Sequence, residues 1–474
     1  MTIDDPTPSG GSADPSPAGR PGSGDAVTDS TAGSHWLERL GLHRPELRAW
    51  ALYDWANSAF VLVVVTAVFP IYYQRIATDG GGLDPATATK YFSYATAVTL
   101  GLVALLSPAL GAIADFRAAR KRFLAAFIAL GSLASAGLAT VHPGEWQLAL
   151  VFFAIGNLAL FLSFVFYDSL LPHLARDDAE LDRVSTAGYA IGYLGSGLLL
   201  LAQVALIQNP HWLGLPDAGA ATRFCFLLVA VWWALFSIPI LRRVPEPARV
   251  LEGDESSAMG AVDAAFSRLR ETLGELRGRY RPAFWMLVAF MIYNEGIGTI
   301  IRMGAIYAET KAFPESSIMI AILLIQFVGI PFAFAFGALA TRFGAKQMIL
   351  VGLAVYCVVA VVGYTMETVA QFYLMAALIA AVQGGTQGLS RSLFGAMIPK
   401  HKASELFGFF SVFSKVAGII GPLVFGLVIE LTGSIQHAVL SVVVFFIVGA
   451  LLLTRVDVAE GKRKAGAELD PATL

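Results

Sequence analysis

Long apolar segments alternate with short polar loops along most of this chain. Each segment is close to or above the roughly 20 residues that an α-helix needs to cross the hydrocarbon core of a membrane. The pattern predicts six spans, a longer polar stretch and six further spans. The first six lie at about 50–74, 91–113, 123–141, 147–171, 185–207 and 222–241, and the second six at about 283–308, 316–339, 347–365, 369–390, 405–430 and 435–454. We therefore expect an all-α membrane protein with twelve transmembrane helices.

The basic residues gather in alternate loops of this pattern. The Lys and Arg residues within 117–122, 176–183, 242–281, 342–346, 400–402 and 455–464 all fall on one side of the predicted membrane. The opposite loops hold little beyond Arg75, Lys90 and Lys311. Because basic residues are enriched in cytoplasmic loops, we expect both termini and the central loop to be cytoplasmic. The high Ala and Gly content and the lack of targeting signals favour a multi-pass protein of a bacterial cytoplasmic membrane.

Composition agrees with a membrane protein. Hydrophobic residues make up 56% of the chain and charged residues 14%, whereas soluble domains are about 25% charged. The net charge of −2 gives no indication of a nucleic-acid partner. Cys225 and Cys357 both lie inside apolar segments, so they do not form the loop-borne framework of a disulfide-rich protein.

Composition also predicts the domain organisation. We expect a disordered cytoplasmic tail over 1–45, a six-helix bundle over 46–241, a cytoplasmic linker over 242–282, a second six-helix bundle over 283–455 and a cytoplasmic tail over 456–474. The first 34 residues are rich in Gly, Pro, Ser, Asp and Thr and cannot bury enough apolar surface to fold. In the linker, Phe266, Leu269, Leu273 and Leu276 have helical spacing, which predicts an amphipathic helix along the membrane surface.

The first predicted span contains a cluster of polar residues. Asp54, Asn57 and Ser58 stand at positions i, i+3 and i+4, which places an acid, an amide and a hydroxyl on one face of a helix. Carboxylates inside membrane helices are costly and usually face a protein interior or a water-filled cavity. Such a cluster is typical of a transporter.

The loops after spans 2 and 8 repeat one pattern. The first, at 111–122, reads GAIADFRAARKR, and the second, at 337–346, reads GALATRFGAK. Both resemble the loop signature of the major facilitator superfamily, Gly-x-Leu-Ala-Asp-Arg-x-Gly-Arg-Lys, although Phe116 replaces its arginine in the first copy and Thr341 replaces its acid in the second. Small residues let two helices approach closely, and we expect Asp115 and Arg342 to latch helix ends in one state. The alternative is a charged turn that serves topology only.

A narrower resemblance covers about residues 45–455. Tyr53–Phe60, Gly188–Gly195, Arg391–Pro399 and the pair Gly421-Pro422 look like the vacuole-effluxer branch of that superfamily, which includes the yeast autophagy-linked vacuolar amino-acid exporter. The resemblance implies the major facilitator fold, with twelve helices in two pseudo-symmetric bundles of six, and secondary transport. It leaves the substrate open.

In the fold that this resemblance implies, spans 1, 4, 7 and 10 line a central cavity, and the intramembrane charges of this chain fall largely on those spans. Asp54 on span 1, Asp168 on span 4 and Arg391 at the end of span 10 lie near the predicted cytoplasmic ends. We hypothesise that these three residues form an ionic cluster that closes a cytoplasmic gate and breaks when the cavity opens inward. The alternative is that their side chains only extend to the membrane interface.

A second polar group is expected deeper in the membrane. Glu295 lies near the middle of span 7, Arg302 follows it on the same face, and Lys415 is at similar depth on span 11. A midplane carboxylate near cations suits a proton carrier, and the alternative is a fixed structural ion pair. The amides expected to contact a polar solute are Asn57, Asn294, Gln383 and Gln387.

Together these features favour a secondary active transporter of a small polar solute, with amino acids as the candidate substrate and protons as the candidate coupling ion. The sequence has no Walker loop, so we do not expect ATP to drive transport within this chain. It has no His-Glu-x-x-His run and no cysteine pair at metal spacing, so we expect no enzyme activity, no cofactor and no bound metal. The alternative function is a transport-inactive receptor or scaffold on the same fold.

Overall fold

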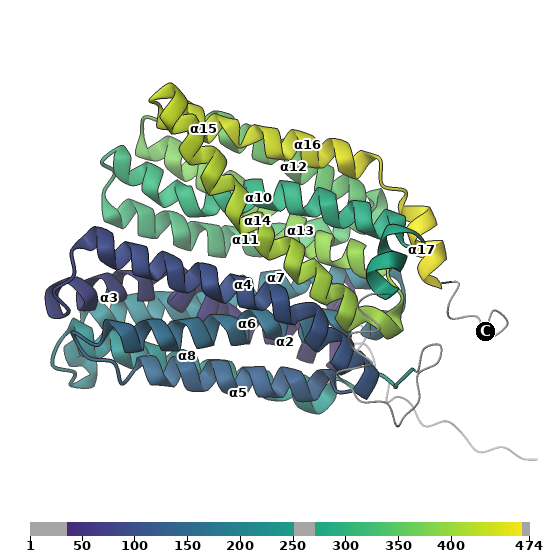
Figure 1. Cartoon of the computed structure of the whole chain (residues 1–474), viewed down its shortest axis with the longest axis horizontal. Coiled ribbons are helices and arrows are strands. Elements are labelled where there is room, and N and C mark those ends of the chain that lie inside the picture. The colour runs from purple at the N-terminus through teal and green to yellow at the C-terminus, as the bar shows by residue number, and fades with distance from the viewer. Residues whose placement is uncertain (1–35, 251–270, 467–474) are drawn as a thin grey trace, which may run out of the picture.

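The computed structural model describes residues 36–250 and 271–466, and this part of the chain is helical throughout, without a strand (Figure 1). Eleven of its helices are long and apolar enough to cross a membrane. Helix α14, with 30 residues, is the twelfth long helix. The all-α membrane fold with twelve spans that the hydrophobic pattern predicted is confirmed.

The helices follow the predicted spans closely. In the first half they are α2 (Pro45–Phe60), η1 (Val61–Ala67), α3 (Phe69–Arg75), η2 (Ile76–Gly80), α4 (Pro85–Arg117), α5 (Arg120–Leu138), α6 (Trp146–Leu174), α7 (Asp178–Gln208), η3 (Pro210–Leu213) and α8 (Ala218–Arg243). In the second half they are α10 (Arg281–Thr310), α11 (Glu315–Phe343), α12 (Ala345–Tyr364), α13 (Val369–Ala396), η4 (Lys400–Lys402), α14 (Ala403–Thr432), α15 (Ile435–Ser441), α16 (Val443–Thr454) and α17 (Val458–Gly466).

Short polar residues at the loops define where several helices begin. Asp177 caps α7 by accepting a hydrogen bond from the backbone N–H of Glu180 (2.7 Å). Thr368 and Gln371 form a capping box at the start of α13, which satisfies backbone donors that have no partner within the helix.

The first span is less regular than the sequence suggested. After α2 the chain continues as η1, a π-helical segment of seven residues. Helix α3 follows with Pro70 near its start, where the missing N–H of proline removes no hydrogen bond. π-helical segments are rare and are frequently found at functional sites. The π-helical segment that follows Asp54 and Asn57 therefore agrees with a functional role for this span.

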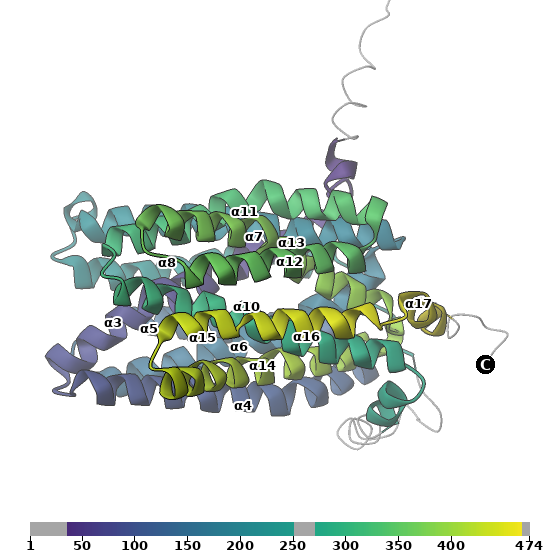
Figure 2. The same cartoon turned by 90° about the horizontal axis from the view of Figure 1, so that it is seen from above.

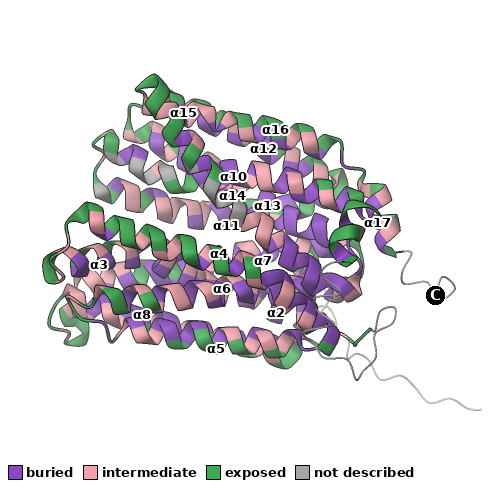
Figure 3. Ribbon diagram, viewed as in Figure 1, coloured by how far each residue is buried: buried purple, intermediate pink, exposed green. Residues whose placement is uncertain are grey.

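Each half of the chain has its own hydrophobic core. The buried residues of one core all lie between Leu42 and Val244, and those of the other lie between Leu276 and Val456. Two separate cores of this kind correspond to two bundles of six helices each. Figure 3 shows exposed residues along the outer helices and buried residues gathered around α7 and α13, where the bundles meet.

The two bundles meet most closely at one end of the molecule, which we name the basic end. It carries the loops at 118–119, 175–177 and 397–402 together with helix α17, and lies on the right in Figure 1. There the start of α14 contacts the last turn of α4 through a hydrogen bond from Glu405 to Asp115. Toward the opposite end the two helices diverge, as Figure 1 shows, where α14 runs diagonally away from α4. Figure 2 shows the helices from above, with α17 at the same end as the C-terminus.

The linker and the tails lie only partly within the described residues. Residues 271–277 are helical, with Leu276 buried and Leu273 exposed, and Lys402 holds this helix through an ion pair with Glu275 (2.7 Å). Phe266 and Leu269 lie outside the described residues, as does the tail up to residue 35. The predicted amphipathic helix therefore remains a prediction for that segment.

Candidate functional site

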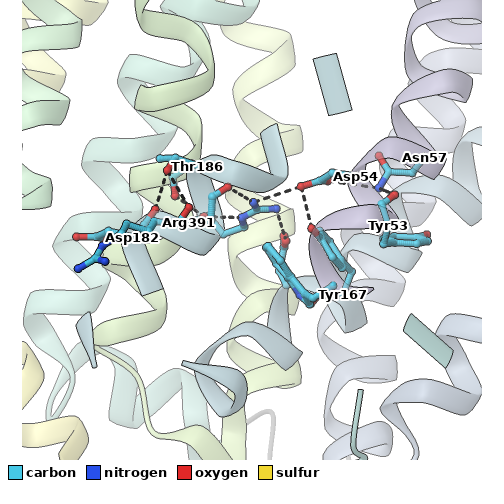
Figure 4. A network of polar contacts seen from close by, with 12 residues as sticks. Tyr53, Asp54, Asn57, Tyr167, Asp182, Thr186 and Arg391 are labelled. Carbon is cyan, nitrogen blue, oxygen red and sulfur yellow. Dashed lines mark hydrogen bonds and ion pairs between the residues drawn. The ribbon is translucent and has the colours of Figure 1, made fainter. Parts of the chain in front are cut away.

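The structure places Arg391 between the two bundles at the basic end. It lies five residues before the end of α13, which is about 8 Å along the helix, and its side chain is only 6% exposed. Its Nη1 atom is 3.1 Å from Oδ1 of Asp168 on α6. Its Nη2 atom is 3.4 Å from Oδ2 of Asp54 on α2. The three charges that were predicted to form a gate are therefore in contact, and Figure 4 shows Arg391 facing Asp54.

Hydrogen bonds from α7 complete the surroundings of the guanidinium. The Nε atom of Arg391 donates to Oγ of Ser185 (2.9 Å), and Nη2 donates to the backbone carbonyl of Ser185 (2.7 Å). The Ser185 hydroxyl in turn donates to the carbonyl of Gly388 (2.6 Å). A buried charge is tolerated when paired and hydrogen-bonded in this way. The bonds also join α7 of the first bundle to α13 of the second.

Three aromatic rings surround the same guanidinium. Its carbon lies 4.7 Å from the ring centroid of Trp50, 4.9 Å from that of Tyr189 and 5.4 Å from that of Tyr167. The Tyr167 hydroxyl donates to Oδ2 of Asp54 (2.8 Å), as Figure 4 shows. Cations over ring faces at these distances are attracted by the quadrupole of the ring.

These rings do not stand out in the sequence, because aromatic residues are common in membrane spans. One signal was available for Trp50, since it precedes Asp54 by four residues and so shares its helix face. Gly188 makes the close approach possible. A Cβ atom there would lie 2.3 Å from Oδ2 of Asp54, so any side chain would displace the carboxylate.

A second ionic cluster joins the bundles beside α4 and α14. The Nη2 atom of Arg120 is 2.7 Å from Oδ1 of Asp115, and Arg120 also contacts His173. The other oxygen of Asp115 accepts a hydrogen bond from the backbone N–H of Glu405 (3.0 Å) in the first turn of α14. A carboxylate at this place is stabilised by the positive end of the helix dipole. Arg120 also donates to the carbonyls of Lys400 and His401 (3.3 Å each).

Small residues allow α4 and α14 to touch here. A Cβ atom on Gly111 would lie 2.3 Å from the backbone oxygen of Ser404. A Cβ atom on Gly408 would lie 2.7 Å from Cα of Pro108. The structure therefore agrees with the expectation that small residues of the repeated loop let two helices approach closely.

Further hydrogen bonds cross between the bundles at the same end. Each joins a side chain of the first bundle to one of the second: Asp182 with Ser392 (2.5 Å), Ser169 with Ser404 (3.0 Å), Ser107 with Ser411 (3.3 Å) and Asp178 with Lys462 of α17 (2.6 Å). Asp182 and Ser392 are both buried. The basic end is thus closed by polar contacts in addition to packing.

Glu295 lies deep in the second bundle, where the sequence placed it. It is 2% exposed, and Oε1 accepts a hydrogen bond from the backbone N–H of Gly421 (2.5 Å). The same oxygen is 3.7 Å from Nη2 of Arg302, whose side chain is 43% exposed. Glu295 therefore holds α10 against α14 at Gly421, and it also has a cationic neighbour in Arg302.

The remaining predicted residues separate into different surroundings. Gln387 donates to Asn294 (2.8 Å), so these two amides are paired, while Asn57 donates to Asp54 (3.4 Å) and belongs to the Arg391 cluster. Nζ of Lys415 lies 3.6 Å from the ring centroid of Phe161 on α6. Two other predicted residues lie apart from the clusters described above: Gln383 is half-buried on α13, and Arg342 is exposed at the end of α11, over the ring of its neighbour Phe343.

The described residues include no group of three or more His, Cys, Asp or Glu side chains that could hold a metal ion. Cys225 is buried, Cys357 is half-buried, and both are free thiols. The groups that the Arg391 cluster presents are a guanidinium, carboxylates, hydroxyls and aromatic rings.

Comparison with known proteins gives consistent matches along the chain. A family model described as "Vacuole effluxer Atg22 like" matches residues 43–466. The uncharacterized MFS-type transporter YxiO of Bacillus subtilis (strain 168) is 36% identical over 406 residues, which cover 85% of this chain and 93% of that protein. Autophagy-related protein 22-1 of Penicillium rubens is 22% identical over 90% of this chain and 92% of its own length.

Solved structures with the same fold are also transporters. The MFS proton:xylose symporter XylE, bound to 6-bromo-6-deoxy-D-glucose, matches with a TM-score of 0.64 at 14% identity, over 92% of this chain and all of its own. The MFS transporter FucP in the outward conformation matches with a TM-score of 0.63 at 13% identity, over 87% of this chain and all of its own. At such low identity these matches establish the major facilitator fold alone.

Proposed function

The chain belongs to the vacuole effluxer Atg22-like family of the major facilitator superfamily, and we propose that it is a proton-coupled secondary transporter of a small polar solute. Members of this superfamily are membrane transporters, so the chain is a transporter rather than an enzyme. Amino acids are the proposed solute class. The proposal also places the basic end in the cytoplasm of a bacterial cell, with transport by alternating access between the two bundles. The ion gradient, rather than ATP, would supply the driving force.

The contact of Arg391 with Asp54 and Asp168 is the observation that carries this proposal. The arginine belongs to the second bundle and both acids belong to the first, so the cluster exists only while the bundles are together at the basic end. If that end is cytoplasmic, as the positive-inside rule suggests, the conformation described above is closed to the cytoplasm. Movement of the bundles apart would break the cluster and admit the solute from that side.

Glu295 is the proposed proton-coupling residue. It is buried near the middle of its span, and an intramembrane acid is commonly part of a proton pathway. Its contacts with Gly421 and Arg302 also suit a fixed structural role. The variant Glu295→Gln separates these roles, because the amide oxygen of glutamine still accepts the hydrogen bond from Gly421 whereas the side chain no longer binds and releases a proton.

The test is solute-dependent proton flux in proteoliposomes, with a pH-sensitive dye inside and a panel of amino acids, short peptides and sugars outside. We expect one solute class to drive flux in the natural protein. We expect Glu295→Gln to abolish this flux while sparing solute exchange, which needs no net proton movement. Glu430→Gln is the matched control, because Glu430 is an exposed acid on α14.

Two results would contradict the proposal in different ways. Flux with unchanged pH dependence in Glu295→Gln would remove the coupling role from this residue while leaving the transporter in place. Absence of flux and of exchange across the whole panel, with folded protein in the vesicles, would instead favour a transport-inactive receptor or scaffold on the same fold.

A further inference from the structure

The ion pairs, hydrogen bonds and ring contacts described above for the Arg391 guanidinium all come from the opposite bundle. We name as the cation cage the set Trp50, Asp54, Tyr167, Asp168, Ser185 and Tyr189. These residues lie on α2, α6 and α7 of the first bundle, whereas the guanidinium that they enclose lies on α13 of the second. The cage thus binds a cation that is not part of its own bundle.

Contacts within the first bundle hold the cage in shape. The rings of Trp50 and Tyr167 are stacked, with centroids 4.3 Å apart, and the indole N–H of Trp50 donates to the carbonyl of Tyr167 (3.0 Å). The Tyr167 hydroxyl positions one oxygen of Asp54, and Asn57 contacts the other. None of these contacts requires Arg391, so Trp50, Tyr167 and Asp54 would keep their arrangement after the guanidinium has left.

Opening the basic end would leave this preformed cage without its cation. Asp54 and Asp168 would then be two neighbouring carboxylates beside aromatic rings with no cation between them, and like charges placed close together disfavour one another. Water can hydrate the acids, but water does not replace the attraction between a cation and three ring faces. A soluble cation of similar shape would restore both kinds of contact.

We propose that, in the conformation open at the basic end, the cation cage binds the guanidinium or alkylammonium group of a transported solute, with a basic amino acid as the solute class. Arg391 is the tethered substitute that fills the cage when that end is closed. This inference rests on the proposed transport function and narrows its substrate. A planar guanidinium fits best, since it pairs with carboxylates and stacks on rings at the same time.

Competition between Arg391 and the solute follows from this arrangement. Both bind the same carboxylates and rings, so each excludes the other. A cationic solute on the basic side would therefore stabilise the open conformation, and its departure would let Arg391 return. Substrate binding and closure of the basic end are thus linked through a single site.

Binding of L-arginine and L-citrulline to the purified Arg391→Ala protein tests the proposal. The two amino acids have nearly the same shape, but citrulline carries a neutral urea in place of the guanidinium. With the tethered cation removed, we expect isothermal titration to give a dissociation constant for arginine about 10- to 30-fold lower than that for citrulline, which is the ratio expected for a desolvated cation on aromatic faces. The additional change Asp168→Asn should reduce this ratio.

Equal binding of arginine and citrulline to Arg391→Ala would overturn the proposal, as would selective binding that Asp168→Asn leaves unchanged. If Arg391→Ala is not monodisperse, Arg391→Met keeps the aliphatic stem and takes its place. The transport screen distinguishes the two failures. Uptake of neutral amino acids without competition from arginine would refute the cage as a solute site and leave the transport function in place. Selective binding of arginine over citrulline without uptake of any solute would support the cage and refute the transport function.

Discussion

Removal of the Arg391 side chain should shift the protein toward the conformation that is open at the basic end. In the closed conformation, Arg391→Ala leaves Asp54 and Asp168 buried without their cation, and it deletes the two hydrogen bonds to Ser185. In the open conformation, the same acids are exposed to water whether or not the arginine is present. The substitution therefore destabilises the closed conformation selectively.

The magnitude follows from the burial of the pair. The side chains of Arg391, Asp54 and Asp168 are 6%, 10% and 13% exposed, so solvent screens their interaction little. Removing one partner of a buried ion pair typically costs about 3–5 kcal/mol. Taking the lower figure, the ratio of open to closed molecules should rise about 150-fold.

Thiol labelling at a residue that only the open conformation exposes measures this ratio. Ser404 is fully buried at the contact between α14 and α6, so Ser404→Cys serves as the reporter in a background that carries Cys225→Ala and Cys357→Ala. The protein is held in nanodiscs and treated with a membrane-impermeant maleimide. When closing is faster than labelling, the labelling rate is proportional to the open population.

Arg342→Ala is the matched control, because it removes an exposed arginine at the same end that belongs to neither cluster. We expect it to change the labelling rate by less than about twofold, since exposed charges contribute little, whereas Arg391→Ala should raise the rate by up to about 150-fold. Equal rates in the two variants would refute the reasoning, because the cluster would then not hold the basic end closed.

Two further variants test the same closure from other directions. The double variant Asp168→Arg with Arg391→Asp exchanges the two charges. Its transport rate should be about tenfold higher than that of either single variant, as expected for directly contacting residues. A transport rate no higher than that of the single variants would show that the 3.1 Å contact is not functional. Gly111→Val should raise thiol labelling at position 404, since overpacking costs about 1–3 kcal/mol in the closed state and the backbone of Ser404 leaves no room for a Cβ. Gly101→Val, on the same helix in open space, should leave the rate unchanged.

The charged part of the site was predictable because charges are rare in membrane spans. Asp54, Asp168 and Arg391 each interrupt an apolar segment, and the span order alone placed them at one end. The aromatic part was not predictable in the same way. Trp50 and Tyr189 are ordinary residues for a membrane helix, and only the packing of α2 against α7 brings them to one cation.

Symmetry between the halves was a less reliable guide. The repeated loop suggested that Asp115 and Arg342 would play equivalent parts. The structure places Asp115 against Arg120 and the start of α14, but Arg342 remains exposed over Phe343. The difference has a physical cause, because the second copy has Thr341 where the first has its acid, so no carboxylate is available there to organise a cluster.

The two clusters at the basic end share one arrangement of charge across the interface. In both, the carboxylates belong to the first bundle: Asp115 in one, and Asp54 with Asp168 in the other. In both, the second bundle supplies a positive partner, which is the N-terminal end of α14 for Asp115, beside Arg120 of its own bundle, and the guanidinium of Arg391 for Asp54 and Asp168. One movement of the bundles therefore leaves Asp54 and Asp168 without the guanidinium and leaves Asp115 without the N-terminal end of α14, while Asp115 keeps Arg120 of its own bundle. Protons or a cationic solute on that side would offset the loss, so the arrangement itself links opening to the arrival of positive charge.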